Sequence, residues 1–178
     1  MSLLRDVVAQ MEAEGIPFAL IGAAAMAVHG VSRATADIDL LTVDPRALRK
    51  DLWSGFEARG ASLRLIEGDI DDPLAGSMRF SLAGDRIVDI VVGRYAWQRE
   101  IIETAEEISI GEITVKVARP AGLVLLKLHA GGPKDAWDIC ALLESHEQAM
   151  VIKAEVDRMV TRLPAECLRL WERLRDGR

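Results

Sequence analysis

The chain of 178 residues has few cysteines and no long apolar run, and each shortage excludes a class of protein. Its two cysteines, Cys140 and Cys167, lie in leucine-rich stretches, which favours buried thiols over a disulfide framework. The longest apolar candidate, residues 122–128, contains Lys127 and falls far short of the roughly 18 to 20 residues that span a bilayer. The first residues lack the features of a signal peptide. We therefore expect a cytoplasmic protein with no membrane partner.

Basic residues are also outnumbered, with 22 Lys and Arg against 28 Asp and Glu and a formal net charge of −6. This balance argues against broad, sequence-independent nucleic-acid binding, which needs a basic face. It leaves open the docking of one RNA end on a local patch. Half of the residues are hydrophobic, which is enough for a full core. We expect one cooperative domain, made of an α/β core over residues 1–118 and a C-terminal helical part over residues 119–178.

Hydrophobic periodicity predicts the order of the elements. Apolar residues three or four apart indicate helices, and short apolar runs between turn residues indicate strands. The expected helices cover residues 2–14, 23–29, 46–59, 95–104, 120–130, 133–144, 148–163 and 165–175. The expected strands cover residues 18–21, 37–43, 62–66, 78–82, 86–92, 107–110 and 113–117, with an acidic loop at 67–73 and a hairpin turn at 83–85. Mixed elements followed by helices predict an α+β fold with C-terminal helices.

Asp37 and Asp39 stand two residues apart inside an apolar run. Side chains two apart on a strand share a face, so both carboxylates should project together while Ile38 turns into the core. Adjacent carboxylates repel each other unless a cation lies between them, and ligation by oxygen alone favours Mg²⁺. Aspartates near a strand end are also common as solvated turn formers or helix caps. The strand-forming residues that follow favour the metal site.

Four further residues before and after this pair have two interpretations each. Asp89 is flanked by aliphatic residues, so it is either solvated on an edge strand or adds a third carboxylate, as two-metal nucleotidyl transfer requires. Gly22 precedes a helix N-terminus, which either binds phosphate or is only a tight turn. Arg33 either contacts a triphosphate or is exposed, and Thr35 either braces the loop or is exposed.

Lys127 interrupts the most apolar predicted helix of the chain. It either extends to water or points into the site as a cation for phosphate. Lys134, Asp135 and Asp138 follow on the next helix, where the two aspartates share a face. Acidic residues at the start of a helix also stabilise it without any ligand. Both interpretations remain open from the residues alone.

Three motifs occur in one order: Ile-Gly-Ala-x₃-Ala-x-His-Gly-x₂-Arg-x-Thr-x-Asp-Ile-Asp-Leu, then Val-Asp-Ile-Val, then Leu-Lys-Leu followed by Pro-Lys-Asp-x₂-Asp-Ile. Together they resemble the nucleotidyltransferase superfamily, and within it the small bacterial branch of AbiEii-type toxin nucleotidyltransferases. The resemblance covers roughly residues 16–144. It implies a nucleotidyltransferase-like mixed β-sheet core flanked by helices.

The resemblance also implies roles for individual residues. Mg²⁺ would bind Asp37, Asp39 and Asp89, and the turn at Gly22 and Ala23 would hold the phosphates of the nucleotide. Residues matching Lys127 and either Asp135 or Asp138 serve nucleotide binding or activity in the family. The family turn is usually Gly-Gly or Gly-Ser; here alanine keeps the backbone N–H but supplies no hydroxyl.

These features predict an Mg²⁺-dependent enzyme that moves NMP from an NTP to a hydroxyl acceptor. The NTP would contact Gly22, Arg33 and Lys127. The acceptor is an RNA end such as that of tRNA, a protein or a small molecule. From the resemblance we expect a toxin role, with an antitoxin protein as the partner. The alternative is a non-catalytic member of the same fold that binds a nucleotide or a partner protein.

Overall fold

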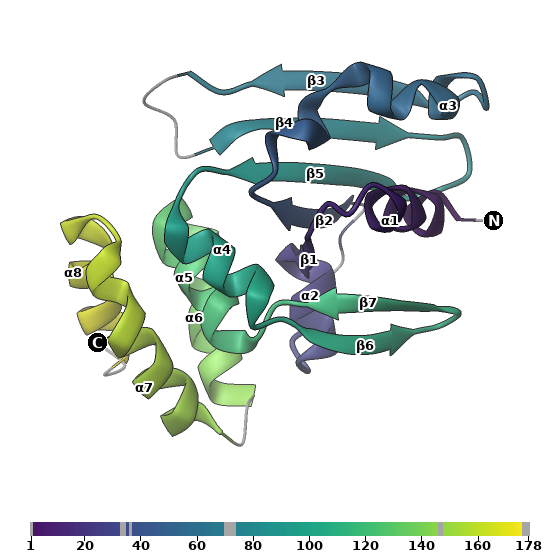
Figure 1. The fold of residues 1–178 in the computed structure, drawn as a ribbon. Helices are drawn as coiled ribbons and strands as arrows, with labels where there is room; N and C mark the ends of the chain where they lie inside the picture. The colour runs from purple at the N-terminus through teal and green to yellow at the C-terminus, as the bar shows by residue number, and fades with distance from the viewer. Residues whose placement is uncertain (1, 33–34, 36, 70–73, 146–147, 176–178) are drawn as a thin grey trace. The chain divides into compact units, whose positions relative to one another are not determined.

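The computed structural model describes residues 2–32, 35, 37–69, 74–145 and 148–175. The chain divides into two compact units, of which the first combines residues 1–24 and 34–118 and the second combines residues 25–33 and 119–178. Figure 1 labels the elements of both units. Each unit is described by itself below.

The first unit contains a mixed seven-stranded sheet in the order β3-β4-β5-β2-β1-β7-β6 (Figure 1). The strands are β1 (Ala19–Ile21), β2 (Asp37–Thr42), β3 (Ser62–Glu67), β4 (Leu74–Ser81), β5 (Ile87–Gly93), β6 (Glu106–Ile110) and β7 (Ile113–Val117). Two neighbouring pairs, β2 with β5 and β1 with β7, are parallel, and the other pairs are antiparallel. The predicted mixed-sheet fold is therefore confirmed.

Helical segments of the first unit pack on this sheet. They are α1 (Leu3–Ala13), η1 (Pro45–Leu48), η2 (Lys50–Trp53), α3 (Ser54–Glu57) and α4 (Ala96–Glu103), and the first residues of α2 (Gly22–Val28) also belong here. Trp53, Phe56 and Phe80 make edge-to-face contacts with ring centroids 4.9 to 5.7 Å apart. Each such pair adds about 0.5 to 1.5 kcal/mol beyond simple burial. This aromatic cluster fixes one face of β4 as the core face.

The predicted single helix over residues 46–59 is wrong. The structure has two 3₁₀ helices and one short α-helix there, and the extended backbone of Arg49 separates the first two. In a continuous helix the Ala47 carbonyl would accept a hydrogen bond from the residue four positions later. Here it accepts one from the buried indole N–H of Trp53 at 2.9 Å. Burial of the tryptophan therefore overrides helical periodicity.

Other boundaries differ by smaller amounts. Strand β4 begins at Leu74 rather than at residue 78, and Glu67 belongs to β3, since Glu67 pairs with Gly76. Of the predicted acidic loop, residues 68–69 are described and lie outside a strand, and residues 70–73 are not described. The helix predicted over residues 148–163 ends at Met159 and continues as a 3₁₀ turn.

The second unit is helical. It contains the rest of α2 together with α5 (Pro120–Ala130), α6 (Pro133–Ser145), α7 (Ala149–Met159), η3 (Val160–Arg162) and α8 (Ala165–Arg175). Helix α5 contacts α6, α7 and α8, and its apolar residues from Leu123 to Leu125 are buried. Cys167 is buried as predicted, while Cys140 is half-buried. Within the described part of the chain, no helix has the length and apolar character needed to cross a membrane.

Candidate active site

The register of β2 and β5 brings the predicted carboxylates to one face of the sheet. Asp39 lies directly opposite Asp89 on the parallel strand β5, and Asp37 lies two residues before Asp39 on the same face. Side chains on the other face, such as those of Ile38 and Leu40, are buried. The alternation in Asp-Ile-Asp-Leu therefore separates a polar row from the core, as the sequence predicts.

Arg79 completes this row from the next strand. It lies opposite Asp89 across the β4–β5 ladder. Its Nε donates to Asp89 Oδ1 at 2.8 Å and its Nη2 donates to Asp89 Oδ2 at 2.7 Å, while Nη2 is 3.4 Å from Asp37 Oδ2. The hydrogen bonds to Asp89 raise the pKa of Arg79 above its ordinary value. The side chains of Asp37, Asp39 and Asp89 thus lie together with the guanidinium of Arg79. We call these four residues the carboxylate row.

Gly22 lies against this row where β1 turns into α2. Its φ of +66° is in the left-handed region that glycine adopts most easily. A Cβ at this position would lie 2.1 Å from Asp39 Oδ2, so the carboxylate occupies the space that a side chain would need. The backbone conformation and the lack of space for a Cβ therefore both require glycine here. This turn is the one expected to bind phosphate.

The backbone entering β2 is braced from two sides. The Thr35 hydroxyl donates to the Asp37 carbonyl at 3.2 Å and accepts from the Asp37 N–H at 3.3 Å. Arg86, the residue before β5, donates to the Thr35 carbonyl at 3.0 Å. The bracing interpretation of Thr35 fits these contacts. Arg33, which was predicted to contact a triphosphate, lies outside the described residues.

The donor set suits an oxygen-preferring divalent cation. The row offers carboxylate oxygens without thiolate or imidazole groups, which is the chemistry that Mg²⁺ prefers. Among the described residues, no three or more His, Cys, Asp or Glu side chains are grouped as a metal site. Arg79 forms an ion pair with Asp89 at 2.7 Å and one with Asp37 at 3.4 Å.

Lys127, Asp135 and Asp138 form a separate ionic cluster in the second unit, which we call the lysine cluster. Lys127 Nζ is 2.9 Å from Asp135 Oδ1 and 2.5 Å from Asp138 Oδ2. Asp138 is fully buried, and Asp135 also accepts from the Gly132 N–H at 3.1 Å, where α6 begins. Burial lowers the pKa of Lys127, but hydrogen bonds to both aspartates outweigh burial and raise it. Lys134, also predicted to bind nucleotide, is exposed in the first turn of α6.

Arg79 and Arg86 are residues of the site that were not predicted from the sequence. For Arg79 a signal was present, because it stands five residues before Gly84 and Asp89 stands five residues after it. A hairpin centred on Gly84 places the two opposite each other, so their opposite charges predict a cross-strand pair. No comparable pattern points to Arg86, which acts on backbone carbonyls.

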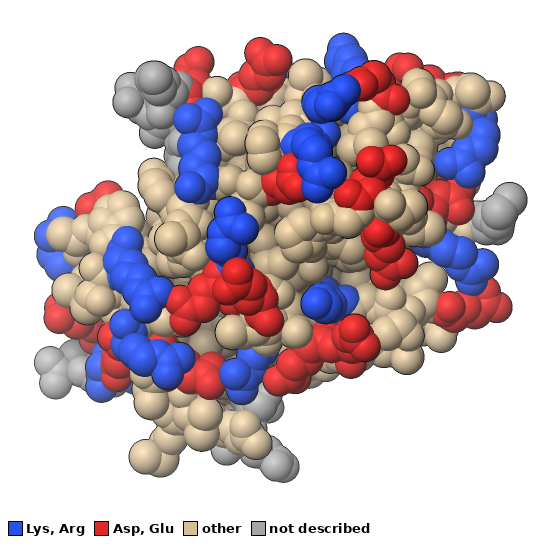
Figure 2. Space-filling view, viewed as in Figure 1, with Lys and Arg blue, Asp and Glu red and all other residues tan. Residues whose placement is uncertain are grey.

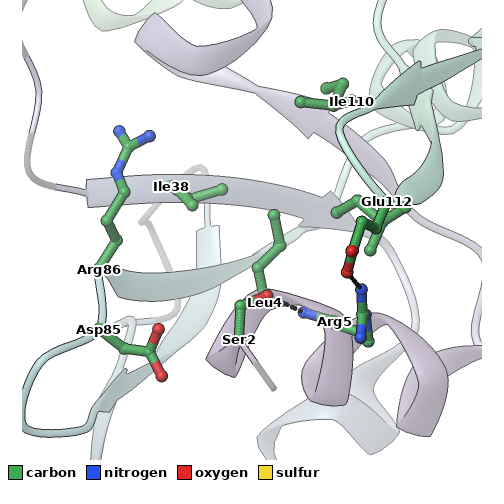
Figure 3. Close-up of a pocket in the computed structure, with 9 residues that line it drawn as sticks. Ser2, Leu4, Arg5, Ile38, Asp85, Arg86, Ile110 and Glu112 are labelled. Carbon is green, nitrogen blue, oxygen red and sulfur yellow. Dashed lines mark hydrogen bonds and ion pairs between the residues drawn. The ribbon is translucent and has the colours of Figure 1, made fainter.

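A pocket of about 500 Å³ lies elsewhere in the first unit (Figure 3). Ile38, Leu4 and Arg86 contribute to its lining, and Arg5 forms an ion pair with Glu112 beside it. Because Ile38 points here, the pocket is on the face of β2 opposite the carboxylate row. On the molecular face shown in Figure 2, acidic and basic side chains are interspersed rather than gathered by sign.

Several solved structures have a similar architecture and identify the fold. A solution structure of the antibiotic-resistance factor ANT(2'')-Ia has a TM-score of 0.60 and 18% identity and covers 90% of each chain. A crystal structure of ANT(2'')-Ia with adenylyl-2''-tobramycin has a TM-score of 0.56 and 17% identity, over 90% of this chain and 96% of that one. The lincosamide adenylyltransferase LnuA, bound to lincomycin, has a TM-score of 0.50 and 15% identity, over 78% and 93%. The fold is that of the nucleotidyltransferases.

The family follows from the sequence itself. Residues 3–164 match the model of the AbiEii nucleotidyl transferase toxin of type IV toxin–antitoxin systems. The chain belongs to this family and is a nucleotidyltransferase, as its motifs predict. No curated protein matches it.

Proposed function

We propose that the chain transfers NMP from an NTP to a hydroxyl acceptor at the carboxylate row, in an Mg²⁺-dependent reaction. The observation that carries the proposal is the β2–β5 register, which places Asp39 beside Asp89 and on the same face as Asp37. These are the carboxylates that the motif resemblance assigns to the metal. Family membership supports the reaction class.

The residues of the row would divide the work. Asp37, Asp39 and Asp89 would supply ligand oxygens, and a bound Mg²⁺ would neutralise phosphate charge during the displacement. The Gly22–Ala23 turn would hold phosphate oxygens, because Gly22 already lies against Asp39. Thr35 would keep the backbone at Asp37 in place through its two hydrogen bonds.

The chemistry is a single displacement at phosphorus. The acceptor oxygen forms a bond to the α-phosphorus as the bond to the pyrophosphate oxygen breaks, and the hydroxyl proton is released. Positioning and charge neutralisation supply most of the rate enhancement in such a reaction. The proposed nucleotide contacts of Arg33, Lys127 and Lys134 remain predictions, as does the choice between Asp135 and Asp138.

We further propose that the protein acts as the toxin of a toxin–antitoxin pair in the cytoplasm, with an antitoxin protein as its partner. The matched family model, which describes a toxin of type IV systems, supports this role. ANT(2'')-Ia has been solved with an adenylylated small molecule, so a small-molecule acceptor stands beside RNA and protein as a candidate class.

A labelling experiment tests the function and identifies the acceptor class. The pure protein is incubated with each α-labelled NTP, Mg²⁺ and a cell extract, and label is followed separately into RNA, protein and small molecules. The Asp39→Asn variant is the negative control, and Asp51→Asn, which changes an exposed aspartate paired with Arg49, is the matched control. We expect label to enter one fraction with the unmodified protein and with Asp51→Asn, and to enter none with Asp39→Asn. NTP binding without any transfer would favour the non-catalytic alternative.

A further inference from the structure

We propose that the cavity on the reverse face of β2 binds an amphipathic carboxylate, with its anionic end at Arg86 and its apolar tail over Ile38. This cavity of about 500 Å³ is the one drawn in Figure 3, and we call it the reverse-face pocket. Its volume is usual for a small-molecule site, for which the range is about 300 to 1,000 Å³. Because it lies on the opposite face of the sheet from the carboxylate row, the proposal goes beyond the proposed function.

The apolar part of the reverse-face pocket comes from three elements that are far apart in the sequence. Leu4 belongs to α1, Ile38 belongs to β2, and Ile110 and Ile113 flank the turn between β6 and β7. Ile38 is buried, whereas the other three side chains are half-buried. Aliphatic surface that folding leaves partly uncovered inside a concave site favours an apolar ligand group. The pocket can therefore take an alkyl chain.

The charged residues of the lining differ in whether a partner engages them. Arg5 forms an ion pair with Glu112. The Asp85 carboxylate accepts a hydrogen bond from the Leu3 N–H at 3.2 Å, where α1 begins. Among the residues that the structure describes, Arg86 donates to two backbone carbonyls and forms no ion pair. Arg86 is thus a lining cation without a counter-charge, which favours an anionic ligand.

Arg86 is also held in place before any ligand binds. Its Nη2 donates to the Thr35 carbonyl at 3.0 Å and lies 3.5 Å from the Asp37 carbonyl oxygen. Since carbonyl oxygens carry no full charge, these contacts fix the guanidinium without neutralising it. Within the described part of the chain, its Nε and Nη1 have no acceptor and remain as donors for a carboxylate. A cation that is already positioned loses little conformational freedom when it binds a ligand.

The neighbouring acidic residues favour a ligand with a single negative charge. Asp85 and Glu112 lie in the same lining, so a dianion such as an alkyl phosphate would face carboxylates as well as Arg86. A second cavity of about 340 Å³ in the first unit is also partly apolar, but Glu12 and Glu107 stand beside Lys116 in its lining. An amphipathic carboxylate should therefore choose the reverse-face pocket over this second cavity.

Titration of the ¹⁵N-labelled full chain with octanoate, followed by calorimetry and by NMR, tests the proposal. Octan-1-ol is the probe without a charge, acetate is the probe without a tail, and octyl phosphate is the probe with a dianionic end. We expect octanoate to bind about tenfold more tightly than octan-1-ol or acetate, and more tightly than octyl phosphate. Amide signals should shift at Leu4, Ile38 and Ile113, and not at Ile16 or Phe18 of the second cavity.

Two variants and a matched control separate the charge from the apolar surface. Arg86→Gln removes the cation and should lower octanoate affinity by about tenfold, while the affinity for octan-1-ol stays the same. Ile110→Ala removes apolar surface and should weaken octanoate and octan-1-ol alike, by about fourfold or more. Arg64→Gln removes an exposed arginine of β3 that does not line the pocket, so it should bind octanoate as the unmodified protein does. Thermal unfolding confirms that each variant is folded.

Several results would overturn the proposal. They are the absence of octanoate binding, an affinity for octanoate no higher than that for octan-1-ol or acetate, unchanged octanoate affinity in Arg86→Gln, and signal shifts confined to the second cavity. None of these measurements requires NMP transfer. Failure of this proposal is therefore distinct from failure of the proposed function.

Discussion

The carboxylate row of the sheet and the lysine cluster of the helical unit are built from similar groups in opposite ways. The row sets Asp37 and Asp89 against Arg79, beside Asp39, on a partly exposed face. The lysine cluster sets two aspartates against one lysine, and its Asp138 has no exposed side-chain surface. Excess negative charge within reach of solvent attracts a further cation, whereas a buried group with its own cation mainly holds helices together.

The difference teaches that an aspartate motif gains its meaning from what surrounds it. Asp37 and Asp89 share the row, yet their surroundings differ. The Asp37 side chain is more exposed, whereas Asp89 makes a two-point contact with Arg79. Asp135 caps α6 as well as pairing with Lys127, so a single carboxylate serves two structural tasks. The following experiments test the contrast between a site for a ligand and a structural ion cluster.

The largest effect should come from Asp39→Asn. Loss of one negative ligand at the row should slow NMP transfer by about 10³-fold, because charge stabilisation in the transition state is lost. Initial rates of pyrophosphate release measure this directly. Asp51→Asn should keep the unmodified rate, and a normal rate for Asp39→Asn would remove the row from the mechanism.

Loss of the cation from the lysine cluster should lower the free energy of unfolding. Lys127→Met leaves Asp138 buried without its cation, which should cost about 3 to 5 kcal/mol of unfolding free energy. Urea denaturation measures the loss. Arg49→Met breaks an exposed pair with Asp51 and should cost much less, because solvent screens surface ion pairs. Equal losses in the two variants would show that the lysine cluster is no more structural than a surface ion pair.

Gly22→Ala separates backbone strain from damage to the row. Gly15 has nearly the same φ, +62° against +66°, but a Cβ there would meet no atom within 4 Å. Both alanine variants should lose about 1 to 2 kcal/mol through the left-handed backbone. Only Gly22→Ala should displace Asp39, and misplacement of a ligand at this scale should slow transfer by about 10²-fold. Similar activity in the two variants would mean that Gly22 serves the turn alone.

The smallest expected effect is the pH dependence of the lysine cluster. The folded pKa of Lys127 is raised above its unfolded value. Its contribution is therefore fully present below the unfolded pKa of about 10.4 and is lost as pH rises through the folded pKa. Unfolding free energies measured from about pH 9 to pH 12 should fall more steeply for the unmodified protein than for Lys127→Met. The same pH dependence of the unfolding free energy in both proteins would contradict the raised pKa of Lys127.

Much of the row could be predicted from sequence because its geometry is local. The two-residue period of a strand fixes Asp37, Ile38 and Asp39 without knowledge of the fold. The position of Asp89 beside Asp39 depends on the strand order, so the residues alone left it open, and only the motif resemblance implied that Asp89 joins the pair. The prediction of one long helix at residues 46–59 was wrong because the Trp53 indole donates a hydrogen bond to the Ala47 carbonyl. In a continuous helix that carbonyl would accept from a backbone N–H instead.

Arg79 shows where prediction stopped for a different reason. The hairpin signal at Gly84 predicts a turn, but only the register of the two strands shows that Arg79 faces Asp89. The contacts of Arg86 with backbone carbonyls depend on tertiary packing, and no spacing in the sequence encodes them. The pairing of Lys127 with both Asp135 and Asp138 needed the packing of α5 on α6, which periodicity alone leaves undetermined.

The central claim is that Asp37 and Asp39 form a site for a metal-bound nucleotide. Calorimetric titration of the protein with an unreactive NTP analogue, with and without Mg²⁺, tests it most directly when repeated on the Asp37→Asn/Asp39→Asn variant. We predict that Mg²⁺ strengthens binding to the unmodified protein and has no such effect on the double variant. Equal Mg²⁺-dependent binding by the two proteins would contradict the claim.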